Sequence, residues 1–460
     1  MPASTTLLQR LLAAGAALSL VVAVGANASI ARALTTPTIT VIDINPEGGS
    51  YALDDSDEDG VAVNGMLLFG ADDGTHGRDL YKSDGTVAGT VLVKDINPTG
   101  NSWPSYMVAM GTTAYFSAED GTNDYELWKS DGTEAGTVLV KDINTSGDSL
   151  PRDIVVVGST LYLGATDGTN GRELWKSDGT AAGTVMVKNI NAGGDSSDLG
   201  ELTPLGSTLY FVANDGTNGY ELWKSDGTEA GTVMVKNINV GGGSFPTYLT
   251  ALGSAIYLEA TDGTNGRELW KSDGTAAGTV MVKDINTGGD SGPGDLTTLG
   301  STLYFEANDG TSGYELWKSD GTTAGTVMVK DINTNASAGS DPEFLRRHGD
   351  LFYFFAYDGG VNGDELYLSD GTEAGTMRIP APGATDYVNC DCYDNPIRST
   401  AVGVFFTYYD GMVGHELGFV SDLLPETNTS GNGLALALLA LSGALAAGAV
   451  IARRKELRAN

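Results

Sequence analysis

The sequence predicts an all-β protein: a β-propeller of about eight four-stranded blades, closed by its N-terminal strand and followed by a C-terminal transmembrane helix. Three observations predict this fold. One eight-residue sequence recurs with a nearly constant period, the chain has 64 glycines against 14 prolines, and a long apolar stretch precedes a basic tail. Abundant glycine indicates many tight turns between short strands. A linear β-repeat solenoid is the alternative.

The N-terminal segment, residues 1–28, has the three parts of a secretory signal peptide. Arg10 supplies a positive charge, residues 11–25 form an apolar segment, and residues 26–28 (Ala-Asn-Ala) make a small-residue cleavage site. Cleavage is expected before Ser29. Because the apolar segment is short for a membrane span, export is favoured over an N-terminal anchor.

The sequence ELWKSDGT recurs through the middle of the chain. Successive copies of its aspartate are 47, 47, 48, 47, 47, 50 and 52 residues apart, counting the variant copies at both ends. A period of this length is typical of propeller blades and other stacked β-units. The aspartates are Asp84, Asp131, Asp178, Asp226, Asp273, Asp320, Asp370 and Asp422.

Residues 295–333 show the pattern within one repeat. Short runs of alternating apolar and polar residues, which are typical of strands, are separated by Asn-Asp-Gly and Ser-Asp-Gly-Thr turns. Four short strands joined by three turns make one antiparallel sheet about the size of a propeller blade. The four expected strands are 296–299, 301–307, 314–318 and 325–332.

The two ends of the repeat region are incomplete in complementary ways. Residues 38–45 match the fourth strand of a repeat, as in residues 90–97, without the first three strands. The final copy, residues 401–420, has the second and third strands and lacks a fourth. Because the two parts together make one blade, we expect seven complete blades and one shared blade in a closed ring without exposed edges.

The repeated residues also resemble a known family. ELWKSDGT followed by AGTV and VKDI is similar to the ELWxxDGT repeats of large bacterial extracellular proteins, over residues 37–422. The resemblance implies a surface-exposed, β-rich repeat domain. It implies no particular activity, since that family is defined by its repeat and not by a reaction.

The repeated aromatic and turn residues are expected to be structural. One tryptophan position is filled in five copies and becomes Tyr81 and Tyr367 in the outer two, so packing between blades is favoured over ligand stacking. In the SDGT turn, the aspartate caps the turn and the glycine takes a positive φ. The tryptophans are Trp128, Trp175, Trp223, Trp270 and Trp317.

The SDGTxxGT turn resembles the Asp-box of sialidase propellers, whose active site needs clustered arginines, a tyrosine and acids. Here Arg78, Arg172 and Arg267 alternate with tyrosines at one repeat position, which spreads the guanidinium groups around the ring. The three histidines of the chain accompany no Ser-His-Asp pattern. A propeller hydrolase of extracellular polymers is therefore the least favoured function.

The formal net charge of −33, from 59 acidic and 26 basic residues, argues against nucleic-acid binding and favours cations as partners. Asp55, Asp57 and Asp59, followed by Gly60, resemble the start of a calcium loop. Met66 stands where an EF-hand has its last glutamate, so an acidic solvated loop is the alternative. The DGTNG loops are a second place for weak chelation, although a plain hairpin turn is favoured there.

The C-terminal segment, residues 423–460, resembles the LPxTG cell-wall sorting signal. A pentapeptide precedes an apolar stretch at 433–452, long enough for a transmembrane helix, and a basic tail at 453–460. In that family a sortase-type transpeptidase cuts after the threonine and joins it to the cell wall. A plain membrane anchor and another tail-processing system are the alternatives, because asparagine replaces the final glycine. The pentapeptide is Leu424, Pro425, Glu426, Thr427 and Asn428.

Together these features predict a cell-surface-anchored, non-enzymatic repeat protein that acts in binding, adhesion or interaction close to the envelope. We expect an extracellular location in the cell wall or at the cell surface, with the membrane crossed by the C-terminal helix before any processing. The expected partners are a sortase-type transpeptidase, the cell wall and an unknown extracellular ligand, and calcium is the candidate cofactor. A structural envelope protein stabilised by cations is the alternative function.

Overall fold

The computed structural model describes residues 44–45, 60–84, 86–335, 338–360, 363–379, 397–400, 403–409 and 415–421. Their strands form eight antiparallel sheets, seven with four strands and one with three. In every sheet the strands follow one another in chain order, so each sheet is a simple meander. We number these sheets blade 1 to blade 8.

The first four blades have strands of nearly constant length. Blade 1 contains β1 (Gly60–Val63), β2 (Met66–Asp72), β3 (Arg78–Ser83) and β4 (Val91–Lys94). Blade 2 contains β5 (Ser105–Met110), β6 (Thr113–Glu119), β7 (Tyr125–Ser130) and β8 (Val138–Lys141). Blade 3 contains β9 (Arg152–Val157), β10 (Thr160–Thr166), β11 (Arg172–Ser177) and β12 (Val185–Lys188). Blade 4 contains β13 (Gly200–Leu205), β14 (Thr208–Asn214), β15 (Tyr220–Ser225) and β16 (Val233–Lys236).

The remaining blades continue the same order. Blade 5 contains β17 (Thr247–Leu252), β18 (Ala255–Thr261), β19 (Arg267–Ser272) and β20 (Val280–Lys283). Blade 6 contains β21 (Gly294–Leu299), β22 (Thr302–Asn308), β23 (Tyr314–Ser319) and β24 (Val327–Lys330). Blade 7 contains β25 (Glu343–His348), β26 (Leu351–Tyr357), β27 (Asp364–Ser369) and β28 (Met377–Arg378). Blade 8 contains β29 (Ile397–Thr400), β30 (Gly403–Tyr409) and β31 (His415–Ser421).

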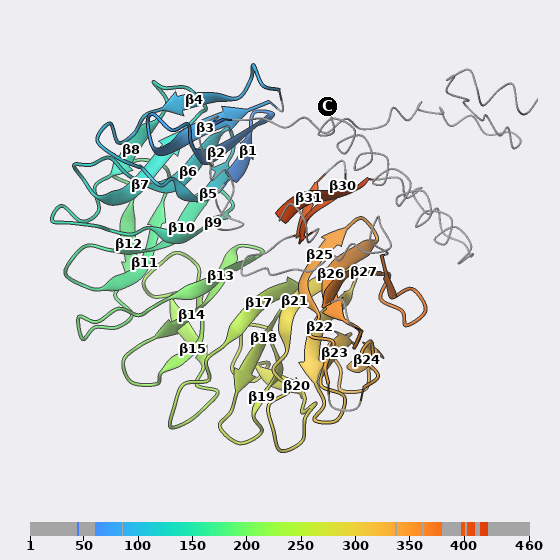
Figure 1. Cartoon of the computed structure of the whole chain (residues 1–460). Coiled ribbons are helices and arrows are strands. Elements are labelled where there is room, and N and C mark those ends of the chain that lie inside the picture. The colour runs from blue at the N-terminus through green and yellow to red at the C-terminus, as the bar shows by residue number, and fades with distance from the viewer. Residues whose placement is uncertain are drawn as a thin grey trace, which may run out of the picture. The chain divides into compact units, whose positions relative to one another are not determined.

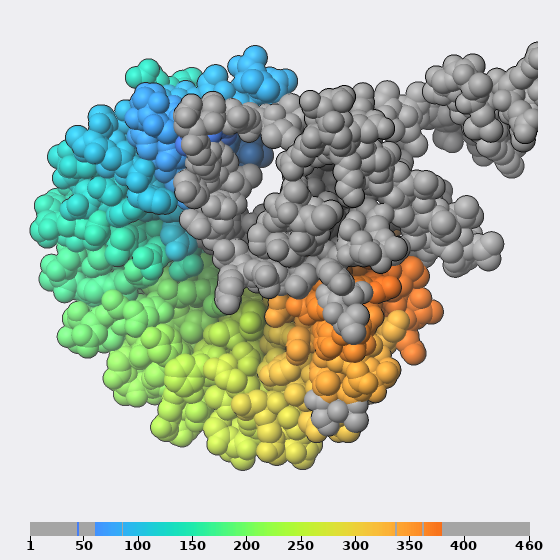
Figure 2. Space-filling view, viewed as in Figure 1, coloured from blue at the N-terminus to red at the C-terminus, as the bar shows by residue number. Residues whose placement is uncertain are grey.

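The first strand of each blade packs against the first strand of the next, from β1 and β5 through to β25 and β29. Figure 1 shows these first strands on the inner side of the unit formed by residues 40–460, with the fourth strands outside. Figure 2 shows blades 1 to 7 following one another as closely packed neighbours in chain order. Four-stranded meanders packed through their first strands are consistent with a β-propeller.

The four strands expected within residues 295–333 are confirmed as β21 to β24, but the fourth is shorter than expected. At its start, Gly325 lies in the turn, where an added Cβ atom would come 2.1 Å from Asp320 Oδ1. At its end, the Ile332 amide donates to the buried Glu315 carboxylate at 2.8 Å. The chain therefore leaves the sheet after Lys330, because the Ile332 amide bonds to the Glu315 side chain instead of to the backbone of the neighbouring strand.

The apolar core lies between blades and not within a single sheet. One cluster joins Leu80 and Val93 of blade 1 to Phe116 and Trp128 of blade 2, and similar clusters recur at later junctions. The repeated tryptophans are only 5–6% exposed. Packing between blades is thus confirmed as their role, since each ring fills the space against the preceding blade.

Two lysines of each repeat also tie one blade to the next. In blade 2, Lys129 Nζ donates to the Gly179 carbonyl at 2.9 Å and Lys141 Nζ donates to the Thr184 carbonyl at 2.7 Å. The Lys141 ammonium lies 5.7 Å from the ring centroid of Trp175. The same pair of bonds recurs at all six junctions between blades 1 and 7.

Residues 44–45 contact blade 1 in the way that the end of one blade contacts the next. An added Cβ atom on Gly74 would come 2.8 Å from Asn45 Oδ1, as one on Gly121 would come 2.6 Å from Asn97 Oδ1. Ile44 packs against the cluster of Phe69, Ala71 and Tyr81 in blade 1. The short N-terminal piece therefore has the environment of the segment that follows a fourth strand.

Several predicted features lie outside the described residues. They are the signal peptide at 1–28, the aspartates Asp55, Asp57 and Asp59, and the whole segment 423–460 with Leu424 to Asn428. Across the part of the chain that the structure describes, no helix has the length and apolar character needed to cross a membrane.

Candidate ligand-binding site

Two positions in each of blades 2 to 7 have a left-handed backbone, and all of these residues except Gly292 carry a side chain. In blade 2 they are Trp103, with φ of 45°, and Tyr106, with φ of 54°. We call them the rim position and the bulge position, because the second lies where the pairing of the first strand shifts between Ser105 and Val108. A left-handed residue other than glycine costs about 1–2 kcal/mol, and such strained positions cluster at functional sites.

The side chain at these two positions changes from blade to blade while the framework stays the same. The backbone at both positions is left-handed in each of blades 2 to 7. A constant scaffold that presents variable side chains is the usual arrangement of a binding surface. The rim positions are Trp103, Leu150, Asp198, Phe245, Gly292 and Asp341. The bulge positions are Tyr106, Asp153, Glu201, Tyr248, Asp295 and Phe344.

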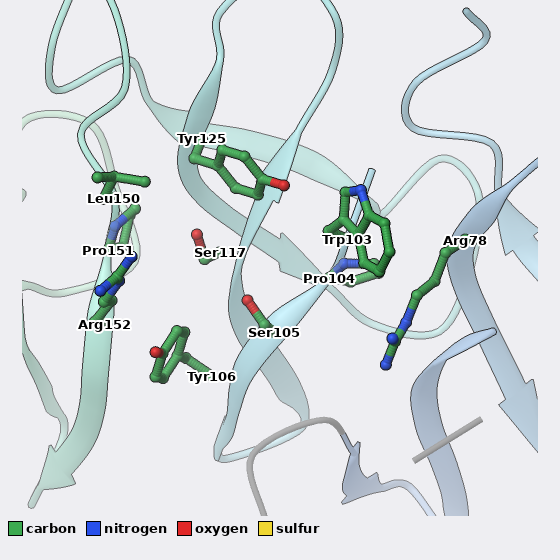
Figure 3. A pocket seen from close by; sticks show the side chains of 10 residues that line it. All are labelled: Arg78, Trp103, Pro104, Ser105, Tyr106, Ser117, Tyr125, Leu150, Pro151 and Arg152. Carbon is green, nitrogen blue, oxygen red and sulfur yellow. The ribbon is translucent and has the colours of Figure 1, made fainter. Parts of the chain in front are cut away.

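A pocket of about 450 Å³ lies over blade 2 and uses both positions. Figure 3 shows Arg78 from blade 1 on one side, Arg152 from blade 3 on the other, and Ser105 and Ser117 of blade 2 between them. We call it the blade 2 pocket. Its lining residues are Arg78, Trp103, Pro104, Ser105, Tyr106, Ser117, Tyr125, Leu150, Pro151 and Arg152.

The Arg78 guanidinium is held by its surroundings. Its central carbon lies 5.3 Å from the ring centroid of Trp103, which is a cation–π distance. The amides of Ser102 and Trp103 both donate to the Arg78 carbonyl, at 2.9 and 3.2 Å. Trp103 is 42% exposed, unlike the five repeated tryptophans. One face of the pocket is therefore an accessible aromatic ring beside a buried guanidinium group, since Arg78 is only 4% exposed.

The charges that line the blade 2 pocket are all positive. Two guanidinium groups, two serine hydroxyls and two phenols contribute polar atoms, and among the described residues no carboxylate or side-chain amide lines it. This composition contrasts with the net charge of −33 for the whole chain. Paired guanidinium groups bind carboxylates well, and aromatic and proline rings provide apolar walls.

Carboxylates gather instead on blades 5 to 7. We define this acidic region by Glu259, Asp295, Glu306, Asp341 and Glu343. Burial raises the pKa of Glu306 to about 9, and the negative charges of Asp295 and Glu343 act in the same direction. The Glu306 side chain fits because residue 294 is a glycine. A Cβ atom on Gly294 would come 2.5 Å from Glu306 Oε1. The two halves of the inner surface therefore differ in electrostatic character.

The glutamate of the ELW sequence has a structural role that the sequence did not reveal. Glu126 accepts hydrogen bonds from the Ile143 amide at 2.7 Å and from the Ser149 hydroxyl at 2.6 Å. It is fully buried, and burial raises its pKa to about 7. Glu268 repeats the arrangement in blade 5, again with a pKa raised by burial to about 7. These carboxylates hold the end of the fourth strand and are not among the residues that line the blade 2 pocket.

The other predicted turn and loop residues are also structural. Asp131 accepts from the Thr133 amide at 2.9 Å, as expected for a capped SDGT turn. In a DGTNG loop, Asp167 accepts from the Thr169 amide at 2.9 Å and from the Asn170 side chain at 2.7 Å. The loop therefore forms a hairpin turn between β10 and β11, and weak chelation by these loops stays a prediction. Among the described residues, no group of three or more His, Cys, Asp or Glu side chains is placed to hold a metal ion.

The structure brings together arginines that sequence reasoning did not pair. Arg78 shares the blade 2 pocket with Arg152, which comes from a different repeat position. Arg172 and Arg267 lie in blades 3 and 5 and are not part of this pocket. His76 lies 2.8 Å from Asp73 through Nδ1, in an exposed loop outside this pocket. The pairing of Arg78 with Arg152 could not be found from periodicity, because it crosses three blades.

Comparison with known proteins gives no family. No protein-family profile and no curated protein matches the chain. A solved prolyl endopeptidase structure is similar at 13% identity and a TM-score of 0.43, with 69% of this chain and 48% of that chain covered. A puromycin hydrolase structure is similar at 11% identity and a TM-score of 0.43, covering 82% and 52%. Oligopeptidase B from Leishmania major is similar at 13% identity and a TM-score of 0.40, covering 69% and 48%.

These findings correct one prediction. The chain spans about half the length of the peptidases to which it is similar, and the similarity concerns their β-sheets. The expectation of a non-enzymatic protein for adhesion or envelope-proximal interaction is wrong, because the similar solved structures are peptidases. The periodic sequence led to that expectation because it carries information about blades and almost none about the pocket that crosses them.

Proposed function

We propose that this chain is a peptide-binding β-propeller that recognises a terminal carboxylate and the side chain next to it. The observation that carries the proposal is the blade 2 pocket, where Arg78 and Arg152 flank an exposed tryptophan. A carboxylate bound by the partly exposed Arg152 guanidinium would leave the adjacent side chain against Trp103, Tyr106 and the proline rings. A pocket of about 450 Å³ is within the usual range for a small ligand.

The lining favours a peptide end over a sugar. Sugar hydroxyl groups need acceptors as well as donors, and carboxylates or amides usually provide them. In the part of the chain that the structure describes, the blade 2 pocket is lined by neither, whereas it offers the Arg152 cation and several apolar walls. A peptide end that combines one negative charge with one apolar side chain satisfies both features.

The test is calorimetric titration of the purified chain with N-acetyl-L-phenylalanine and with the corresponding amide. We expect the acid to bind and the amide to bind at least about tenfold more weakly, because the amide lacks the charge that the guanidinium groups pair with. Arg152→Gln should weaken binding of the acid by a similar factor. Arg347→Gln, in an exposed arginine of blade 7, is the matched control. Equal affinity for acid and amide would overturn the proposal.

We also propose that residues 38–45 supply the fourth strand of blade 8 and so close a ring of eight blades. Support comes from Asn45, whose approach to Gly74 matches that of Asn97 to Gly121, and from the three strands of blade 8. Removal of residues 29–46 should then lower the unfolding free energy and speed amide exchange in blades 1 and 8. Unchanged exchange in both blades would contradict closure.

We propose export through residues 1–28 and retention at the envelope through residues 423–460, with Thr427 joined to the cell wall. The signal-like segments of the sequence support this proposal. Mass spectrometry of cell-wall digests should find a peptide that ends at Thr427 and carries a wall amine. An intact C-terminus at Asn460 in that fraction would exclude sorting.

A further inference from the structure

The residues of the blade 2 pocket have counterparts three repeats further along the chain, in blade 5. Phe245 takes the place of Trp103, Thr247 that of Ser105, and Tyr248 again provides a tyrosine at the bulge position. Among blades 2 to 7, only blades 2 and 5 have an aromatic ring at both the rim and bulge positions. We call the group Tyr220, Phe245, Tyr248, Glu259 and Arg267 the blade 5 site.

The aromatic rings of the blade 5 site are accessible. Phe245 is 46% exposed and Tyr248 is 43% exposed, whereas most large aromatic side chains of the blades are buried. The Phe245 ring is held in place by Tyr220, with the two ring centroids 5.6 Å apart. Tyr220 in turn donates from its hydroxyl to Asp198 at 2.9 Å. The site therefore presents two supported ring faces to solvent.

The charges of the two sites are opposite, although their rings correspond. Tyr220 and Gly294 stand where the blade 2 pocket has Arg78 and Arg152. The blade 5 site therefore has no guanidinium group at these two positions. Glu259 stands where that pocket has Ser117. The one cation of the blade 5 site, Arg267, is paired with Glu259 at 2.9 Å. A carboxylate ligand would thus find no unpaired cation here.

Carboxylates also surround the Tyr248 ring. Burial raises the pKa of Tyr248 to about 12, and the charges of Asp295, Glu306 and Glu259 act in the same direction. A ring face near the negative charge of Asp295 attracts a guanidinium or ammonium group through cation–π and Coulomb interactions together. A bare divalent cation fits less well, since the described residues provide no group of three carboxylate or imidazole ligands arranged for a metal.

We infer that the blade 5 site binds a basic side chain, arginine or lysine, of the same peptide whose terminal carboxylate occupies the blade 2 pocket. The inference rests on the proposed peptide-binding function and adds specificity to it. The cation lies over Phe245 and Tyr248 and is attracted by Asp295, the charge that acts most on Tyr248, while Glu259 stays paired with Arg267. Because the two sites have opposite charge, the peptide binds in one direction only.

The test uses a separate small probe for each site. L-argininamide, which carries a guanidinium group and no carboxylate, is titrated into the full chain and compared with L-citrullinamide, its neutral isostere. We expect binding of argininamide that weakens with added salt, and binding of citrullinamide at least about tenfold weaker. Phe245→Leu and Tyr248→Leu, which keep apolar bulk but remove the ring faces, should each weaken argininamide binding about three- to tenfold.

The outcomes separate this inference from the proposed function. Trp103→Leu is the matched control, because it should weaken N-acetyl-L-phenylalanine and leave argininamide unchanged. If N-acetyl-L-phenylalanine binds and argininamide does not, the blade 5 inference fails and the peptide-binding proposal stands. If argininamide binds but calcium displaces it, or if citrullinamide binds equally well, the site does not select a basic side chain. Thermal unfolding of each variant shows whether a loss of binding reflects a loss of folding.

Discussion

The repeated residues of each blade and its two variable positions differ in burial, in backbone geometry and in what they contact. Trp223 is 6% exposed and donates from its indole nitrogen to the Ala213 carbonyl at 3.1 Å, whereas Trp103 is 42% exposed at a rim position. The buried glutamates and the lysines bond to backbone groups that every blade has. The variable residues Trp103, Phe245 and Tyr248 are exposed on a strained backbone. Stability and recognition are therefore assigned to different residues of the same repeat.

This separation explains how near-identical blades can differ in charge. Blade 2 presents Trp103 and Tyr106 beside two arginines, and blade 5 presents Phe245 and Tyr248 beside carboxylates. The rim side chains Trp103 and Phe245 are 42% and 46% exposed, whereas the bulge side chain Tyr106 packs against the apolar cluster between blades 2 and 3. The comparison predicts that framework substitutions unfold the chain and that substitutions at the variable positions change binding.

The largest effect is expected for a repeated tryptophan. Trp223→Ala should lower the unfolding free energy by about 3–5 kcal/mol, because it opens a cavity between blades 3 and 4. Trp103→Ala should lower it by about 1 kcal/mol or less, since only the cation–π contact with Arg78 is lost. Chemical denaturation of both variants measures the difference. Equal losses would show that the rim position belongs to the core after all.

A smaller effect is expected from the pH dependence of the buried glutamates. The pKa values of Glu126 and Glu268 are raised by burial from 4.5 to about 7 in the folded chain. The folded state then binds these protons more tightly than the unfolded state. Their contribution to stability is fully present below pH 4.5 and is lost as the pH rises through about 7. The melting temperature should therefore fall between pH 5 and pH 8.

The double variant Glu126→Gln/Glu268→Gln isolates this contribution from the general repulsion among acidic groups. It should be less stable at pH 5, because an amide cannot accept every bond that the carboxylate accepts, and its melting temperature should change less up to pH 8. Asp84→Asn, at an exposed turn carboxylate, serves as control. A pH slope identical to that of the unsubstituted chain would rule out these glutamates as its source.

Much of the fold could be predicted from the chain alone, because the period and the turn residues are repeated many times. The four strands of blade 6 and the packing role of Trp317 were accessible in this way. The early end of β24 could not be predicted, since it depends on Glu315 reaching the Ile332 amide across the sheet. A contact between side chain and backbone at that separation has no periodic signal.

The candidate site was mostly hidden from the sequence for a related reason. Repeats identify the residues that recur, and a binding surface consists of those that do not. Arg78 was singled out because it alternates with tyrosines, but its partner Arg152 belongs to another position in another blade. The left-handed backbone at Trp103 and Tyr106 was equally hidden, because no glycine marks either residue.

A third prediction concerns the lysines between blades. Lys129→Met should lower the unfolding free energy by about 1 kcal/mol, because the Gly179 carbonyl loses a donor while the aliphatic bulk remains. Lys176→Met, which removes the equivalent bond to Gly227 at 2.8 Å, should have the same effect. Denaturant midpoints compare the two variants. Values that differ by more than about 1 kcal/mol would show that the junctions are not equivalent.

The smallest effect, and the one with opposite sign, is expected at a rim position. Blade 6 already has Gly292 where blade 3 has Leu150, and both have a left-handed backbone with φ of 51° and 46°. Leu150→Gly relieves strain of about 1–2 kcal/mol and adds about 1 kcal/mol of backbone entropy to the unfolded chain. Stability should therefore rise by about 0.5 kcal/mol while N-acetyl-L-phenylalanine binds more weakly, because Leu150 lines the blade 2 pocket. A loss of stability above about 1 kcal/mol would mean that Leu150 belongs to the framework, and the distinction between framework and variable positions would fail in blade 3.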